Sequence, residues 1–477
     1  MRTITVQPQR NNADFEVVIR SFAGQGGLPM SSVLPAEVIE AVFRRHDAVF
    51  GDTYNAIYTT AIVLWAFLSQ VLADGKQRSC SAAVARIADF LMMAGKTPPS
   101  SDSGDYCVAR AKLNENALHE LLAEMARKIE QVTPETWLWQ GRHAKLVDGF
   151  TATMPDTREN QKAFPQQKSQ EKGIGFPIMR VCVVLSLATA CILDAALGPY
   201  TGKETGESAL LREIVDAFAS GDVAVFDRHY CSYMMLALLM LRGVDTCARL
   251  HQARSHDMRR GARLGRHDRL VTWQRPAQPS WMDDATYATI PETITLRMIR
   301  FNIVVPGSRT ESITIVTTLL DADAHPAEAV AELYGYRWNA ELDIRAIKQS
   351  LNLDHLRCLT PKMIRVEFWT TLLAYNLVRK VNCEAAVKHG KLPRRISFTG
   401  TCATLLAAWS TLALGLYDAA ALDCLLARIA SLEIPDRPGR IEPRVLKRRR
   451  HRYPLMREPR KAFKERLNSR TPCDTIT

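Results

Sequence analysis

Residues 334–348 read YGYRWNAELDIRAIK, a stretch whose charged and apolar side chains recur with the period of a helix. At about 100° per residue, one aromatic residue, three cations and one carboxylate fall on a single arc of about 80°. These residues are Tyr334, Arg337, Glu341, Arg345 and Lys348. Apolar residues lie alongside the arc, namely Leu333, Ala340, Ile344, Ile347 and Leu351. The pattern predicts a half-buried helix with Glu341 at the edge of its apolar stripe, and Gly335 is a position where this helix could break.

The helix has two interpretations. A surface helix with ion pairs between residues four apart has similar spacing, and this is the simpler explanation of the stretch by itself. Alternatively, Glu341 holds a metal ion, and the cations one turn to each side bind phosphates. The choice between them depends on whether other carboxylates in the chain can reach the same place.

Two aspartates follow short apolar strands. Asp148 comes after Leu146-Val147, and Asp227 comes after Val223–Phe226. Two-metal phosphoryl chemistry needs a few carboxylates that converge on cations roughly 3.5–4 Å apart, and strand ends are rigid platforms for them. Each aspartate taken singly is also typical of a strand-end cap or a turn. Together with Glu341, they predict a metal-dependent active site.

Helices and strands alternate in a way that indicates an α/β protein with a mixed sheet. Long Ala- and Leu-rich helical stretches fill about residues 35–132, and residues 180–193 have a buried, β-rich pattern. A helix is predicted over 208–219, and the strand before Asp227 follows it. A further helix (233–241) and a strand near 245–250 come next. Between about residues 253 and 323 the helical period is lost, and helices resume after Pro326.

These changes predict six regions. They are a helical N-terminal region (1–140), a first core part with Asp148 and Asp227 (141–254), a β-rich insertion (255–322), a second core part with Glu341 (323–390), C-terminal helices (391–440) and a basic tail (441–477). In the first region, Arg110 and Lys112 lie on a helix that could enter a DNA groove, although a packed helical bundle explains the same pattern.

The positive charge is concentrated near the end of the chain. The formal net charge is +12, and residues 444–470 hold 12 Lys and Arg against Glu458 and Glu465. A polyanion is therefore a plausible partner, with Lys447, Arg448, Arg449 and Arg450 as its contacts. A merely solubilising tail explains the charge equally well.

The remaining composition favours a cytoplasmic protein that does not enter a membrane. The eleven cysteines contain no Cys-x-x-Cys pair, which argues against a disulfide framework or a zinc site. The longest apolar run, residues 181–193, is too short to span a bilayer.

Several motifs together resemble a known family. Tyr334-x2-Arg337-x3-Glu341-x6-Lys348 resembles the Tyr-Arg-Glu-Lys signature of DDE transposases from bacterial insertion sequences, family four. DGFTATMPD (148–156) and GDVAVFDR (221–228) look like the segments around the first and second aspartates of that family. GIGFP (173–177) and GKETGE (202–207) are also similar, and the resemblance covers most of the chain from about residue 140 onward.

The resemblance implies a ribonuclease-H-like core that a β-rich insertion interrupts before the glutamate helix. It implies two Mg²⁺ ions, for which Mn²⁺ can substitute, held by the catalytic residues Asp148, Asp227 and Glu341. It also implies cut-and-paste transposition, in which water frees a 3′-OH at each element end. That hydroxyl can attack the opposite strand to form a hairpin, and it finally joins target DNA. The N-terminal helices would bind the terminal inverted repeats, and a homodimer would assemble in the synaptic complex.

DNA contacts follow from the same resemblance. Arg337 and Lys348 carry over as phosphate contacts and Tyr334 as a contact to the same end, with Arg345 added from the helical arc. An aromatic in the insertion is expected to stack on a flipped base, with Trp273 as first candidate and Trp281 as second. Packing of Trp273 in the core of the insertion is the alternative. A catalytically inactive DNA-binding relative and a nuclease that only hydrolyses DNA remain alternative functions.

Overall fold

The computed structural model describes residues 36–469 except 52, 54–55, 94, 252, 255–256, 304–310, 409–417 and 436–455. Its centre is a nine-stranded sheet with the order β3-β2-β1-β4-β5-β9-β8-β7-β6. The strands are β1 (Ala144–Thr153), β2 (Ile178–Ser186), β3 (Ile192–Pro199), β4 (Val223–Phe226), β5 (Asp245–Arg249), β6 (Ala262–Gly265), β7 (Asp268–Gln274), β8 (Thr293–Ile303) and β9 (Glu311–Thr317). The predicted DNA contacts Lys447, Arg448, Arg449 and Arg450 lie outside the described residues.

The first five strands form one half of the sheet. β1 pairs antiparallel with β2 and β2 with β3, whereas β4 is parallel to β1 and β5 is parallel to β4. All four residues of β4, Val-Ala-Val-Phe, are buried, as expected of a parallel strand covered on both faces. The prediction of a mixed α/β sheet is confirmed.

The register between β1 and β4 aligns the two candidate aspartates. Val147 lies opposite Phe226, so Asp148 and Asp227 are the next residues on neighbouring strands. Side chains alternate between the faces of a strand, and the residues two positions before each aspartate belong to the larger hydrophobic core. Asp148 and Asp227 therefore point toward the same face of the sheet.

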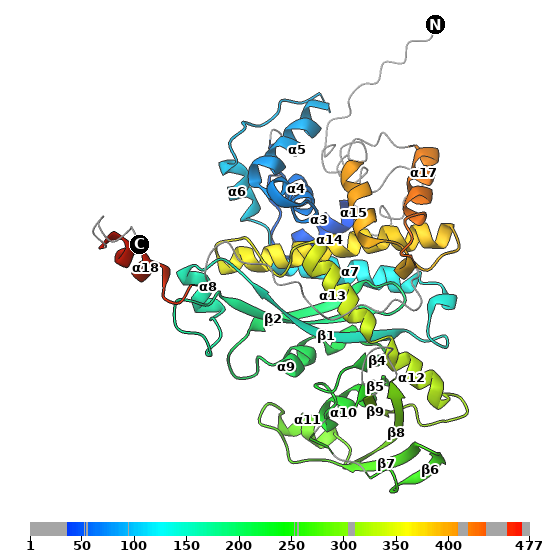
Figure 1. Ribbon diagram of the computed structural model, residues 1–477. Coiled ribbons are helices and arrows are strands. Elements are labelled where there is room, and N and C mark those ends of the chain that lie inside the picture. The colour runs from blue at the N-terminus through cyan, green and yellow to red at the C-terminus, as the bar shows by residue number, and fades with distance from the viewer. Residues whose placement is uncertain are drawn as a thin grey trace, which may run out of the picture.

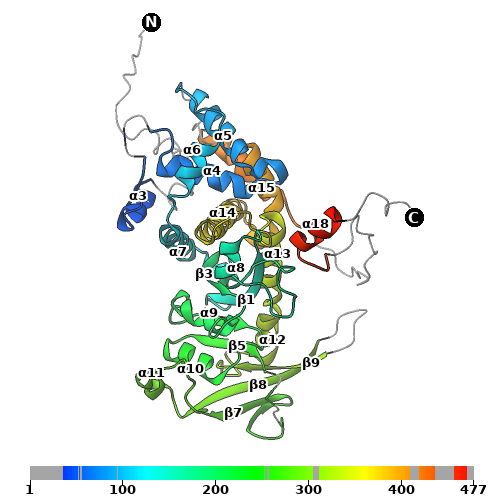
Figure 2. The same ribbon diagram turned by 90° about the vertical axis from the view of Figure 1, so that its left-hand side faces the viewer.

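Helices cover both faces of this half. Residues of α7 (Glu115–Gln131), α13 (Trp338–Ser350) and α14 (Pro361–Lys388) share the larger core with one face. Residues of α9 (Glu207–Glu213) and α10 (Tyr233–Leu241) share the second core with the other. In Figure 2, α13 lies on one side of the sheet and α9 and α10 on the other. The aspartates consequently face the side on which α13, the predicted glutamate helix, packs.

The long helix α14 joins the N-terminal helices to the sheet. It contacts α7 and α4 (Thr60–Leu72) from the N-terminal part of the chain, and α15 (Phe398–Ala407) and α17 (Ala419–Ala430) from the C-terminal part. It runs across the middle of the molecule, with α4, α5 (Cys80–Met93), α15 and α17 on the side away from the sheet (Figure 1). The other α-helices among the described residues are α3 (Ala36–Arg45), α6 (Gly104–Arg110), α8 (Arg158–Ala163), α11 (Asp284–Thr289), α12 (Ala327–Gly335) and α18 (Arg460–Asn468).

Strands β6 to β9 extend the sheet beyond β5. β9 pairs antiparallel with β5 on one side and with β8 on the other, and β8, β7 and β6 follow as antiparallel neighbours. The β-rich segment predicted near residues 255–322 therefore continues the central sheet through β5. It lies at the lower end of the molecule in Figure 1.

Two local expectations need correction. The single helix expected through Tyr334 and Lys348 is divided, because α12 ends at Gly335 and α13 begins at Trp338. Glycine is a poor helix former, and the break falls where the sequence places it. Arg110 does not point outward to a DNA groove, since its guanidinium lies 4.8 Å from the centroid of the Phe67 ring.

Among the helices that the structure describes, none combines the length and the apolar character needed to cross a membrane.

We expect a fragment ending at residue 140 not to fold stably by itself. All thirteen residues of α4 are buried, and α4 and α7 both pack on α14, which such a fragment lacks. Exposure of these apolar faces removes the main source of stability for short helices. Thermal unfolding of the fragment, followed by far-ultraviolet circular dichroism beside the full chain, checks this. A cooperative transition in the fragment would instead establish an independent N-terminal domain.

Candidate active site

Asp148 is held at the centre of the sheet. It lies on β1 between β2 and β4, and its Oδ1 atom accepts a hydrogen bond of 2.8 Å from the backbone N–H of Gly149. Its side chain is only 18% exposed. The backbone of Asp148 is held by its pairing with Val183 on β2, and its carboxylate is largely shielded from water.

Asp227 follows the last residue of β4. Its Oδ1 atom accepts a hydrogen bond of 2.8 Å from the backbone N–H of His229, which forms a turn directly after the strand. The residue is partly buried. Asp227 is therefore a strand-end residue, as predicted, and its carboxylate is close enough to influence the ionisation of Asp148.

Arg337 connects Asp148 with Glu341. It occupies the residue before α13, and Glu341 is one helical turn further on. An Nη2 atom of Arg337 donates to Oε1 of Glu341 at 2.9 Å, and Nη1 lies 3.9 Å from Oδ2 of Asp148. The structure thus brings together a carboxylate from β1 and a carboxylate from a helix nearly two hundred residues later in the chain, with a guanidinium between them.

The carboxyl group of Asp148 is difficult to ionise. Its pKa is raised to about 6, mainly by burial and also by the nearby charges of Asp227 and Glu341, although the Gly149 N–H and Arg337 oppose the rise. For Arg337, burial disfavours the charge, but Tyr334, Glu341 and Asp148 raise its pKa above the ordinary value. Negative charge is therefore concentrated here, and a cation is needed to compensate it.

The donor set fits a hard divalent cation. Asp148, Asp227 and Glu341 offer only carboxylate oxygens, the ligands that Mg²⁺ prefers. The charges of Asp227 and Glu341 also contribute to the raised pKa of Asp148, which places the three carboxylates near one another. As placed, no group of three His, Cys, Asp or Glu side chains in the described part of the chain is close enough to surround one ion. Arg337 occupies the space between two of the three candidate ligands.

Comparison with known proteins identifies the family of the chain. The family model described as "Transposase DDE domain" matches residues 139–377, half of the chain. The chain belongs to the DDE transposases. It is 26% identical over 378 residues to transposase InsG for insertion sequence element IS4 of Escherichia coli (strain K12). The aligned residues make up 76% of this chain and 80% of InsG. The protein is thus a DNA transposase related to that of IS4.

A solved structure gives a weaker match. It is a synaptic complex of piggyBac transposase with hairpin DNA. The matched region covers 90% of this chain and 87% of the piggyBac chain, with a TM-score of 0.43 and 11% sequence identity.

The other residues predicted on the glutamate helix of the transposase lie in different surroundings. Tyr334 is buried at the end of α12, and burial raises the pKa of its hydroxyl. Lys348 is half-buried, with its ammonium 6.0 Å from the centroid of the Phe150 ring. Because Phe150 is two residues after Asp148 on β1, Lys348 lies on the same face as the candidate site. Arg345 is exposed on α13.

The two tryptophans proposed to stack on a base differ in accessibility. Trp273 is 9% exposed in the second hydrophobic core, and the guanidinium of Arg254 lies 4.1 Å from its ring centroid. Trp281 is half-buried, with Arg212 at 3.8 Å from its ring. Base stacking needs an open ring face. Packing of Trp273 therefore agrees with the alternative that it is a core residue, and stacking by either tryptophan stays a prediction.

Sequence reasoning missed two features beside the carboxylates. Trp338, directly after Arg337, is 50% exposed and presents an accessible aromatic ring at the start of α13. A Cβ atom at Gly149 would lie 2.4 Å from Cδ of Glu207, whose carboxylate accepts a hydrogen bond from Tyr230. Gly149 thus allows close packing of α9 behind Asp148. The Tyr-Arg-Glu-Lys signature does not include Trp338. Its position directly after Arg337 could nevertheless have identified it in the sequence as a residue near the site.

We expect Asp148→Asn to stabilise the metal-free protein at about pH 7.5 by roughly 1–3 kcal/mol. The folded pKa of about 6 lies above the unfolded value of about 3.9, so the ionised carboxylate destabilises the fold fully above pH 6. That penalty disappears as the pH falls from about 6 toward 4, because the folded carboxyl group becomes protonated. Urea unfolding of both proteins across this range measures the difference. A variant that is less stable than the wild type at neutral pH would contradict the assigned environment.

Proposed function

We propose that Asp148, Asp227 and Glu341 are the catalytic residues of this transposase and hold two Mg²⁺ ions, which Mn²⁺ can replace. The observation that carries the proposal is the bridge of Arg337 between Asp148 and Glu341, because it joins the strand and the helix at one partly buried, charged place. A divalent ion bound there would activate the attacking oxygen and stabilise the leaving one.

Two reactions of the same kind would follow at this site. In the first, water attacks the phosphorus at the element end, the bond from phosphorus to the 3′ oxygen breaks, and a free 3′-OH and a 5′-phosphate result. In the second, that 3′-OH attacks a phosphorus of the target, and a target 3′ oxygen leaves. Arg337 would hold a phosphate through its guanidinium, which is suited to bidentate contacts. Strand-transfer products separate this activity from that of a hydrolysis-only nuclease or an inactive DNA-binding relative.

We also propose that β1 to β5 form a ribonuclease-H-like core and that residues 255–322 are an insertion in it. Three antiparallel strands followed by two parallel strands, in the order β3-β2-β1-β4-β5, support the first assignment. The return of the chain from β9 to α12 and α13 supports the second. The insertion would then separate Asp227 from Glu341 in sequence without separating them in space.

Element ends and target DNA are the proposed partners. Tyr334, Arg337, Arg345 and Lys348 remain the candidate contacts at the cut end, and the N-terminal helices remain the candidate reader of the terminal repeats. Since an element has two ends, a homodimer would supply one active site for each. The ten cysteines among the described residues are all free, which agrees with the proposed location in a reducing cytoplasm.

The hairpin of β6 and β7 is a further proposed DNA contact. Arg263 and Arg266 are exposed there, and neither forms an ion pair with an acidic side chain among the described residues. Arg263 lies directly opposite Arg269 in the ladder, a pairing of like charges that destabilises a sheet. A phosphate backbone would relieve this repulsion, and a two-stranded ribbon fits the major groove.

We expect Glu341→Gln to abolish both cleavage and strand transfer, because the amide keeps the shape of the side chain but removes the charge that holds a cation. Binding to the element end should survive, since other residues carry it. The measurement is 3′-end cleavage of a labelled terminal-repeat duplex with Mg²⁺, beside a gel shift on the same duplex. Asp148→Asn and Asp227→Asn should behave alike.

Near-normal cleavage by any one of these three variants would remove that residue from the catalytic set. A glutamate that served only in an ion pair on a helix surface would cost a few tenths of a kcal/mol of stability and leave cleavage intact.

We expect the double variant Arg263→Ala/Arg266→Ala to weaken DNA binding and to reduce the slope of log K against log salt by about 2, since each lost phosphate contact contributes roughly 0.9. Arg259→Ala is the matched control, because the guanidinium of Arg259 is already paired with Asp257 at 3.0 Å. Binding measured across a salt series tests both. An unchanged slope in the double variant would exclude the hairpin from the DNA interface.

A further inference from the structure

Asp343 is a buried carboxylate on α13, two residues after Glu341. Its side chain is 3% exposed, and it is one of four buried residues of that helix, with Ala340, Ile344 and Ile347. Residues two apart on a helix point in directions about 200° apart, so Asp343 faces away from Glu341, into the protein. A charge in that position needs partners, since an unpaired buried carboxylate is strongly unfavourable.

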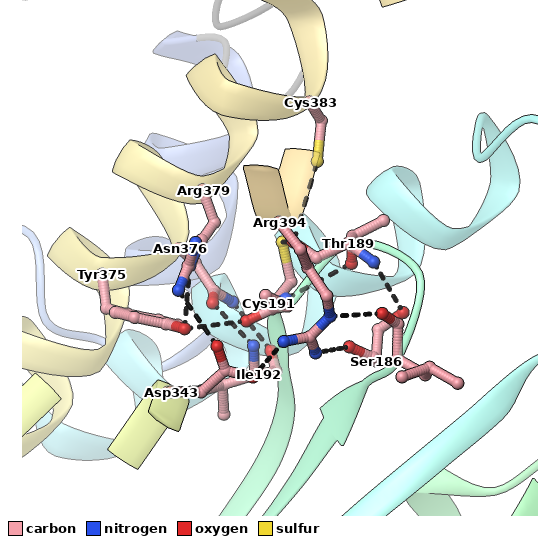
Figure 3. Close-up of polar contacts among 12 residues, drawn as sticks. Ser186, Thr189, Cys191, Ile192, Asp343, Tyr375, Asn376, Arg379, Cys383 and Arg394 are labelled. Atoms are coloured by element: carbon pink, nitrogen blue, oxygen red, sulfur yellow. Dashed lines mark hydrogen bonds and ion pairs between the residues drawn. The ribbon is translucent and has the colours of Figure 1, made fainter. Parts of the chain in front are cut away.

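Two arginines from later in the chain supply these partners. Oδ1 of Asp343 accepts from Nη2 of Arg379 on α14 at 3.0 Å, and Oδ2 accepts from Nη1 of Arg394 at 2.8 Å. Arg394 belongs to the short 3-10 helix η4 (Pro393–Arg395). Figure 3 shows both guanidinium groups converging on the carboxylate. Each oxygen of Asp343 thus has its own guanidinium, which fixes the side chain in direction as well as in distance.

Both arginines are themselves tied to the turn between β2 and β3. Arg394 donates to the carbonyl oxygens of Ser186, at 2.8 Å, and of Leu187. Arg379 donates to the hydroxyl of Tyr375 at 2.9 Å, and that hydroxyl donates to the carbonyl oxygen of Ala190 at 3.0 Å (Figure 3).

This turn leads back to the strand of Asp148. Ser186 is the last residue of β2 and pairs with Lys145 on β1, three residues before Asp148. A continuous set of hydrogen bonds therefore runs from the helix of Glu341, through Asp343 and Arg394, to the strand of Asp148. The apolar contacts of Ala340, Ile344 and Ile347 hold α13 against the sheet, but such contacts are not directional. The charged bonds of Asp343 are directional.

We propose that Asp343, held by Arg379 and Arg394, is a positioning residue that sets the rotation and depth of α13, so that Glu341 faces Asp148. The inference rests on the proposed role of Glu341 as a metal ligand. Catalytic groups must be held to within a fraction of an ångström, and residues that support metal ligands from behind contribute to metal affinity and to rate.

The test compares Asp343→Asn with Glu367→Gln in the full-length protein. Glu367 is an equally buried carboxylate on α14 that accepts hydrogen bonds from the backbone N–H groups of Arg357 and Cys358, so its loss should also lower stability. Two readouts are needed. One is Mn²⁺ binding by calorimetry, and the other is cleavage of a labelled terminal-repeat duplex at increasing Mn²⁺, with the unfolding temperature of each protein recorded.

We expect Asp343→Asn to weaken Mn²⁺ binding and to raise the Mn²⁺ concentration needed for half-maximal cleavage, each by about 10- to 100-fold. Glu367→Gln should lower the unfolding temperature and leave both metal readouts near the wild-type values. If Asp343→Asn changes only stability, as Glu367→Gln does, Asp343 is a structural residue and the proposal is wrong.

Arg394→Lys provides a second variant should Asp343→Asn not fold. Arg394 is 19% exposed, and lysine keeps its charge but cannot reach Asp343, Ser186 and Leu187 at once, so a smaller weakening of Mn²⁺ binding is expected. Wild-type metal affinity in that variant would likewise overturn the proposal. Failure of the wild-type protein itself to cleave would instead count against the catalytic assignment of Glu341.

Discussion

Backbone hydrogen bonding between β1 and β4 is the constraint on which the arrangement of the site depends. The parallel register sets Val147 against Phe226, and the two aspartates follow as the next residues of adjacent strands. Because side chains alternate along a strand, a slip of one residue would turn one carboxylate to the opposite face of the sheet. The apolar composition of β4 and its burial on both faces oppose such a slip. The helix α13, which carries Glu341, packs against a face that this pairing defines.

Placing several carboxylates close together at that face lowers the stability of the folded protein. Asp148 is buried near two further carboxylates, and its pKa of about 6 expresses the energy needed to ionise it there. Arg337 offsets part of this energy by lying between Asp148 and Glu341. The same guanidinium is a candidate ligand for DNA phosphate. Arg337 would then neutralise Asp148 and Glu341 in the free protein and bind a phosphate in the complex with DNA. When metal and DNA arrive, Arg337 would release the two carboxylates, which would become free to bind the metal.

Much of this arrangement could be predicted from the sequence, because it depends on local patterns. The apolar run Val223–Phe226 indicates a buried strand before Asp227, and the spacing from Arg337 to Lys348 is that of one face of a helix. The network around Asp343 could not be predicted, since its partners Arg379 and Arg394 come from other elements and no local pattern connects them. Likewise, a core shared between α4, α7 and α14 leaves no compositional break at residue 140. Trp273 has the same side chain whether it packs or stacks, and only its buried surroundings distinguish the two.

The pairing of β5 with β9 also decides where the sheet stops. Without β9, the edge of the sheet beside the strands of Asp148 and Asp227 would be β5, which could pair with a strand from another molecule. Strands β9 to β6 move that edge to β6, which has only four residues and carries the exposed Arg263. Short, positively charged edge strands discourage pairing between molecules. The segment that separates the carboxylates in sequence therefore also protects the central sheet of this transposase from edge-to-edge aggregation.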